Sequence, residues 1–97
     1  MVTYIMLMKL TDQGRKDIKG APQRIEQGMK TVEAMGGKGI GFYATMGEYD
    51  YVVIGECPSD EVMMTFLLGL GSLGSVTTTT LKAFTKEEFA EMVKRLP

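Results

Sequence analysis

Apolar residues occupy both sides of the segment 2–10. The even positions from Tyr4 to Met8 fall on one side of an extended chain, and Ile5 and Leu7 fall on the other. This pattern is typical of a strand inside a sheet whose two faces are both covered. We therefore predict that 2–10 is a central strand.

The next apolar pattern has the spacing of a helix. Segment 11–20 is polar and is broken twice by glycine, and Pro22 then suits the first position of a helix. The apolar residues that follow recur at helical spacing, at Ile25, Met29, Val32 and Met35. Gly36 and Gly37 end this helix, because glycine enters the left-handed conformation without steric cost.

Two alternating segments then predict a β-hairpin. Residues 38–46 and 49–57 both read as strands, and Gly47-Glu48 between them can form a tight turn. If that turn has two residues, Thr45 lies opposite Asp50.

Two helices and a fourth strand complete the pattern. Ser59 is a suitable cap for a helix whose apolar face comprises Val62, Met63, Phe66, Leu67 and Leu70. Residues 75–84 are rich in threonine and valine and predict a strand. Thr85 and Glu88 form a capping box for a last helix. Its inner stripe is predicted to comprise Phe89, Met92, Val93 and Leu96.

The order of these elements is that of the ferredoxin-like α+β fold. Strand, helix, strand, strand, helix and strand follow one another, as in the split β-α-β repeat. We predict a single domain, residues 1–97, with a four-stranded antiparallel sheet, helices on one face and an additional C-terminal helix.

The second face of that sheet requires a partner, because several strands carry apolar residues on both sides. Met64 and Leu68 add an apolar pair away from the main face of their helix. We infer a homodimer or higher homo-oligomer in which open sheet faces pack together. A monomer with a solvent-facing sheet is the competing interpretation.

Composition narrows the classes of function. Eleven basic and twelve acidic side chains leave a net charge of −1, so we expect no nucleic-acid or membrane partner. The chain has no histidine and one cysteine, Cys57, which argues against a metal, a cofactor or an imidazole-based triad. The apolar N-terminus is too short for a membrane span and lacks a basic leader, so a cytoplasmic protein is expected.

Three further patterns have plain structural explanations. Residues 69–74 match GxGxxG, but they follow a helix and enter a strand, which is the wrong context for a nucleotide. Basic residues within 15–24 are interspersed with acids, so a solvated face competes with an anion site. Cys57 has no histidine to activate it, and we interpret it as a packing residue.

Asp50 is the strongest candidate for chemistry. The predicted register places Tyr43, Thr45 and Asp50 on one sheet face, where a phenol, a hydroxyl and an acid share an apolar surface. A buried carboxylate needs hydrogen-bond donors or its pKa rises, which suits a ligand anchor or a general base. The alternative is structural: Asp50 accepts hydrogen bonds near the turn and fixes the hairpin.

The same segment resembles the GYD domain family. The resemblance rests on 47–50 (GEYD) with its flanks 41–46 and 56–58, and on the early run 10–24, which begins LTDQG. It implies a ferredoxin-like unit of the dimeric α/β-barrel type, small and bacterial or archaeal, with no settled activity. The name-giving positions are Gly47, Tyr49 and Asp50, and the resemblance assigns them no catalytic role.

Three functions remain open at this point. The first is a small-molecule (metabolite) binding module in which Tyr43, Thr45 and Asp50 anchor the ligand. The second is a cofactor-independent enzyme, monooxygenase- or isomerase-like, with Asp50 as proton acceptor and Tyr43 bonded to an oxyanion. The third is a purely structural oligomer in which Asp50 is a brace.

Overall fold

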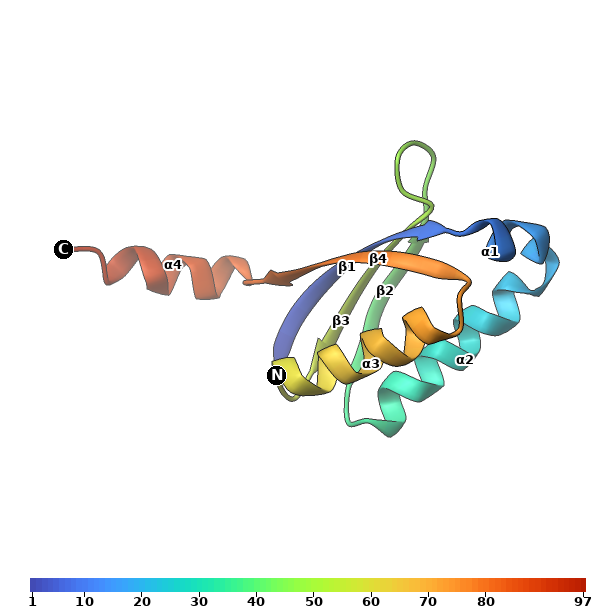
Figure 1. Cartoon of the computed structure of the whole chain (residues 1–97). Helices are drawn as coiled ribbons and strands as arrows, with labels where there is room; N and C mark the ends of the chain where they lie inside the picture. Colours follow the sequence, from blue (N-terminus) through green and yellow to red (C-terminus); the bar gives the residue numbers. More distant parts are fainter.

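A computed structural model describes every residue from Met1 to Pro97. The elements are, in chain order, β1 (Val2–Leu10), α1 (Asp12–Lys16), a 3-10 turn (Ile18–Gly20), α2 (Ala21–Ala34), β2 (Lys38–Ala44), β3 (Tyr51–Cys57), α3 (Asp60–Ser72), β4 (Val76–Ala83) and α4 (Lys86–Lys94). The four strands form one antiparallel sheet in the order β2-β3-β1-β4. Helices α2 and α3 lie on one face of this sheet (Figure 1). The predicted ferredoxin-like α+β fold and the central position of the first strand are confirmed.

The core lies between the sheet and the two helices. Alternate residues of β1 and β3 point toward α2 and α3, so every second side chain of these strands is buried. Burial of each large apolar side chain contributes on the order of 1.5–3 kcal/mol. The buried cluster comprises Tyr4, Met6, Met8, Val32, Tyr51, Val53, Cys57, Met63 and Phe66.

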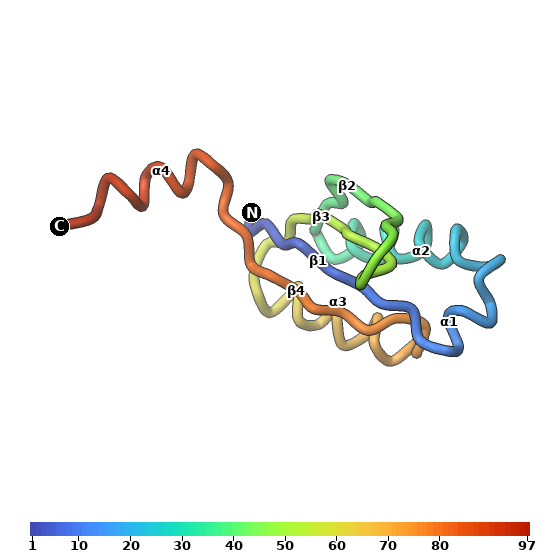
Figure 2. The backbone as a smooth tube through the Cα atoms, turned by 90° about the horizontal axis from the view of Figure 1, so that it is seen from above, coloured from blue at the N-terminus to red at the C-terminus, as the bar shows by residue number.

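The opposite face of the sheet carries no helix, and Figure 2 views the chain from that side. Leu7 is paired with Val52, and Ile5 is paired with both Ile54 and Leu81 across neighbouring strands. These five apolar side chains therefore project from one surface, which we call the open sheet face.

The hairpin differs from its prediction in its turn. The strands end at Ala44 and resume at Tyr51, so six residues rather than two connect them. A two-residue type I′ turn needs positive φ at both central residues, and only Gly47, at +107°, has one. The predicted register is nevertheless correct, because the Thr45 amide donates to the Asp50 carbonyl at 2.9 Å.

Segment 11–20 contains more structure than its polarity indicated. Thr11 caps α1, accepting a hydrogen bond from the amide of Gly14, and a 3-10 turn leads from α1 into α2. A helix of five residues is stabilised by its surroundings and leaves little periodic signal in the sequence.

Helix α4 begins at the predicted cap but does not pack on the sheet of its own chain. Thr85 and Glu88 form both hydrogen bonds of the capping box. The prediction that the apolar stripe of α4 is buried is wrong for a single chain. None of the residues of α4 is buried, and the helix extends away from the sheet (Figure 1). Thr85, the cap of α4, is extended, with φ −66° and ψ 163°, and α4 follows it beyond the end of β4 (Figure 1).

A polar contact fixes the start of α3 on β1. The buried Tyr4 hydroxyl donates to Asp60 Oδ1 at 2.5 Å, and Lys82 Nζ lies 3.1 Å from Asp60 Oδ2. Burial, and next the bond to Asp60, raise the pKa of Tyr4 to about 12. The bonds from Tyr4 and then Lys82 lower the pKa of Asp60.

These shifts predict a loss of stability in alkali. The unfolded Tyr4 phenol ionises near its ordinary pKa of 10.0, whereas the folded one retains its proton to about 12. The Tyr4 contribution is therefore complete below pH 10 and declines as the pH rises toward 12. We expect the difference in unfolding free energy between the wild type and Tyr4→Phe to shrink across pH 9–11 in urea titrations. A constant difference over that range would contradict this assignment.

Candidate functional site

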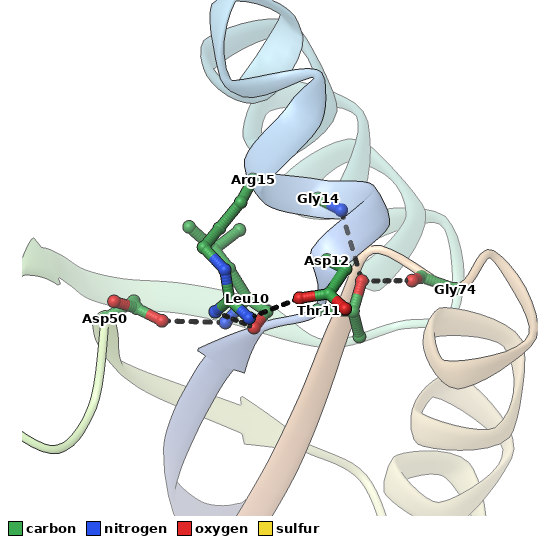
Figure 3. Close-up of polar contacts among 7 residues, drawn as sticks. All are labelled: Leu10, Thr11, Asp12, Gly14, Arg15, Asp50 and Gly74. Atoms are coloured by element: carbon green, nitrogen blue, oxygen red, sulfur yellow. Dashed lines mark hydrogen bonds and ion pairs between the residues drawn. The ribbon is translucent and has the colours of Figure 1, made fainter.

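Asp50 joins the start of β3 to the end of β1. Its carboxylate Oδ2 accepts a hydrogen bond from the Leu10 amide at 2.8 Å (Figure 3). The amide of Asp50 donates to the Met8 carbonyl at 2.8 Å. The ladder between β1 and β3 ends at the pair Met8–Tyr51, so Asp50 supplies the acceptor that a longer β3 would have provided to Leu10. This bond explains why an acid precedes a buried strand.

The other predicted site residues are only partly brought together. Thr45 is bound to Asp50 through the backbone, and its hydroxyl donates to the Tyr49 carbonyl at 2.6 Å, which closes the loop. Tyr43 is 61% exposed and pairs with Val52. No hydrogen bond links its phenol to the carboxylate of Asp50.

The two remaining motif positions belong to the same loop. Gly47 takes the positive φ that its turn requires. The Tyr49 ring lies under Lys9, whose ammonium is 5.4 Å from the ring centroid and 3.8 Å from Glu48. The motif thus holds the loop against the last part of β1.

Further hydrogen bonds hold the end of β1. Arg15 donates to the Leu10 carbonyl at 2.7 Å and pairs with Asp12 at 2.8 Å (Figure 3). The Thr11 hydroxyl donates to the Gly74 carbonyl at 2.6 Å and accepts from the Gly14 amide at 3.1 Å. We call the set Leu10, Thr11, Gly14, Asp50 and Gly74 the β1 junction.

Two glycines of the β1 junction are required by geometry. A Cβ on Gly14 would stand 2.2 Å from the Ser75 carbonyl oxygen, a distance that no packing adjustment of side chains can relieve. Gly74 has φ +82°, which a residue with a side chain adopts only with strain. Close approach and a left-handed turn therefore bring α1 and the α3–β4 connection together.

The GYD domain model matches residues 4–93, nearly the whole chain. The chain belongs to the GYD domain family. The two segments that carry this resemblance, the run from Leu10 and the loop that contains Gly47, Tyr49 and Asp50, meet in space at the β1 junction. In this chain the motif residue Asp50 thus makes a tertiary contact with the end of β1.

A curated relative adds a different kind of information. The chain is 34% identical over 97 residues to a protein of Thermus thermophilus named "Glutamine synthetase and cystathionine beta-lyase binding protein". The similarity spans 99% of each chain. The two proteins therefore match over their entire domain.

A cavity lies on the helical side of the sheet, away from Tyr43, Thr45 and Asp50. It has a volume of about 400 Å³ and lies between α2, α3 and the strands, with mostly apolar walls. Gly28 and Gly69 line it, and both have open space where a Cβ would stand. Glycines inside two predicted helices are the sequence signal that could have indicated this cavity.

The competing motifs have structural roles. Arg15 pairs with Asp12, and Arg24 pairs with Asp17 at 2.9 Å, as a solvated charged face would. Of the GxGxxG glycines, the first two lie within α3 and only the last makes a turn. Cys57 is fully buried, and burial raises the pKa of its thiol, which supports its interpretation as a packing residue. No helix has the length and apolar character needed to cross a bilayer.

The Asp50 hydrogen bond predicts a graded loss of stability. Asp50→Ala leaves the Leu10 amide without its acceptor and is expected to cost about 1–3 kcal/mol of unfolding free energy. Asp50→Asn retains a carbonyl oxygen that can accept the same bond, so its cost is expected to be smaller. Equal losses in urea titrations of the two variants would show that this bond is not the cause.

The close approach at Gly14 predicts opposite effects for two similar substitutions. Gly14→Ala forces a methyl group against the Ser75 carbonyl and is expected to lower the unfolding free energy by about 1–3 kcal/mol. Gly69→Ala is the matched control in α3, where the new methyl meets open space; it is expected to raise the unfolding free energy by up to about 1 kcal/mol. A neutral Gly14→Ala would contradict the packing of α1 against the α3–β4 connection.

Proposed function

We propose that this chain is a protein-binding module that attaches to a metabolic enzyme, with glutamine synthetase as the first candidate partner. The observation that carries the proposal is the full-length similarity to a relative named for binding glutamine synthetase and cystathionine beta-lyase. A cytoplasmic location is part of the proposal, since such partners act on small metabolites.

The surface of α3 offers a suitable contact. Met64 and Leu68 are 55% and 64% exposed, although both are large and apolar. Met64 also borders a shallow hollow of about 390 Å³ beside Asp60 and Lys82. An apolar centre next to a charged rim is the usual arrangement of a protein-binding surface, where an inserted side chain supplies much of the affinity.

Self-association belongs to the same proposal. Apolar residues of β1, β3 and β4 project from the open sheet face, and packing against a second copy would remove them from water. The Met64–Leu68 surface lies on the helical side, so a dimer formed through its sheets would present two such surfaces. Two surfaces would increase the avidity for an enzyme with several subunits.

Metabolite binding is the second candidate, and the cavity between α2 and α3 favours it. A volume of about 400 Å³ with apolar walls is within the range of small-molecule sites. The anchors predicted from the sequence, Tyr43, Thr45 and Asp50, do not line this cavity. Their role in binding or in catalysis stays a prediction, and the hydrogen bond from Leu10 to Asp50 supports the bracing role.

The test is direct binding to purified enzyme. Glutamine synthetase from the same organism is immobilised, and binding of the wild-type chain is measured by interferometry. We expect saturable binding, and an affinity at least tenfold weaker for Met64→Glu with Leu68→Glu. The control, Gln23→Glu with Gln27→Glu, places the same two charges on α2 and should bind normally.

Two results would refute parts of this proposal. Absence of wild-type binding to both glutamine synthetase and cystathionine beta-lyase would refute the choice of partner. Normal binding by the Met64→Glu, Leu68→Glu variant would refute the choice of surface.

A further inference from the structure

Helix α4 has an apolar stripe that its own chain does not cover. The stripe residues are all exposed, and two of them, Phe89 and Leu96, are 62% and 69% exposed. Phe84, in the linker that leads to α4, is 54% exposed. The remaining members of the stripe are Met92 and Val93.

A helix of this length is not stable by itself. Helix α4 has nine residues, whereas isolated helices shorter than about 12–15 residues are marginal in water. Its capping box and the Lys94–Glu91 pair at 3.1 Å contribute only modestly. The helix therefore needs a packing surface for its stripe.

Helix α4 projects beyond the end of β4, away from the core of its own chain. Two linker residues and nine helical residues extend it roughly 20 Å beyond β4. Figures 1 and 2 both show α4 lying beyond the end of the sheet, clear of α2 and α3. The stripe is thus held away from the core of its own chain.

The open sheet face alone is small for a stable dimer. Four strands about 4.8 Å apart and about seven residues long give a footprint of roughly 440 Å². Stable interfaces bury about 800 Å² on each partner. Two reciprocal contacts by a helix about 14 Å long and 10 Å wide would add nearly 300 Å² to each chain and supply most of the difference.

We propose that α4 is an exchanged arm whose apolar stripe docks on a second copy of this chain. The arm continues the proposed sheet interface, because Leu81 on the open sheet face and Phe84 in the linker lead directly from β4 into the stripe. The inference rests on the homodimer included in the proposed function. It adds reciprocal arms that hold the two copies together.

The experiment measures the dimer dissociation constant of full-length chains by light scattering during size-exclusion chromatography and by sedimentation. The arm variant carries Phe89→Glu with Val93→Glu. The control, Ala90→Glu, introduces one of these two charges on α4 outside the stripe, about 100° around the helix from Phe89. Circular dichroism verifies that each variant is folded, which is expected because α4 lies outside the core.

We expect a wild-type dimer, at least a tenfold weaker dimer for the arm variant and unchanged affinity for Ala90→Glu. A wild-type affinity in the arm variant would overturn the proposal. A monomeric wild type would also overturn it. The sheet variant Leu7→Glu separates the two interfaces: a dimer lost in Leu7→Glu and kept in the arm variant retains the proposed homodimer and rejects the arm.

The location of the arm is tested in dimers mixed from isotope-labelled and unlabelled chains. We expect isotope-filtered nuclear Overhauser effects between the Met92 methyl group of one chain and methyl groups of the other. Effects confined within one chain would show α4 folded back on its own sheet and would reject the exchange. Enzyme binding by the same variants is measured separately, so failure of the partner assignment leaves the result on the arm intact.

Discussion

A sheet with helices on one face only is the constraint on which the rest of this structure depends. Helices α2 and α3 remove one set of side chains of β1 and β3 from water, and the alternation of a strand leaves the other set facing outward. In this chain the second set is also apolar, at Ile5, Leu7, Val52, Ile54 and Leu81. All the strands of the fold are therefore present and paired, but the apolar residues on one face of the sheet remain uncovered. The uncovered sheet face and the stripe of α4 are both apolar surfaces that a single chain leaves exposed.

The end of β1 is the second point at which the fold is determined. Beyond Met8 the strand loses its neighbour β3, and side chains replace the missing ladder: Asp50 accepts from the Leu10 amide, and Arg15 donates to the Leu10 carbonyl. Side chains thus provide the hydrogen bonds of backbone groups at the point where the strand pairing ends. The glycines of the β1 junction have a related role, since Gly14 lets α1 approach the backbone of Ser75.

The sequence was informative where the signal was local or periodic. The order of the elements, the caps at Ser59 and Thr85 and the hairpin register followed from spacing and side-chain chemistry, and the structure agrees. The six-residue loop was missed because a glycine beside Glu48 resembles a tight turn, whereas only Gly47 takes a positive φ. The direction of α4 was missed for a different reason. An apolar stripe predicts that a helix packs on a surface, but it carries no information about which chain supplies that surface.

A similar limit of the sequence explains why Asp50 was predicted to be a ligand anchor or a general base. A carboxylate beside a buried strand is costly unless it is bonded, and the sequence alone cannot distinguish a ligand from a backbone amide as the donor. The donor found here is the Leu10 amide, 40 positions away in the chain. With that bond made, the apolar groups on the surface become the stronger basis for function. Met64 and Leu68 lie on the helical side, while Leu7 and Ile54 lie on the other. In the proposed function, a second copy and a different protein would therefore occupy opposite sides of the chain and would not compete for one surface.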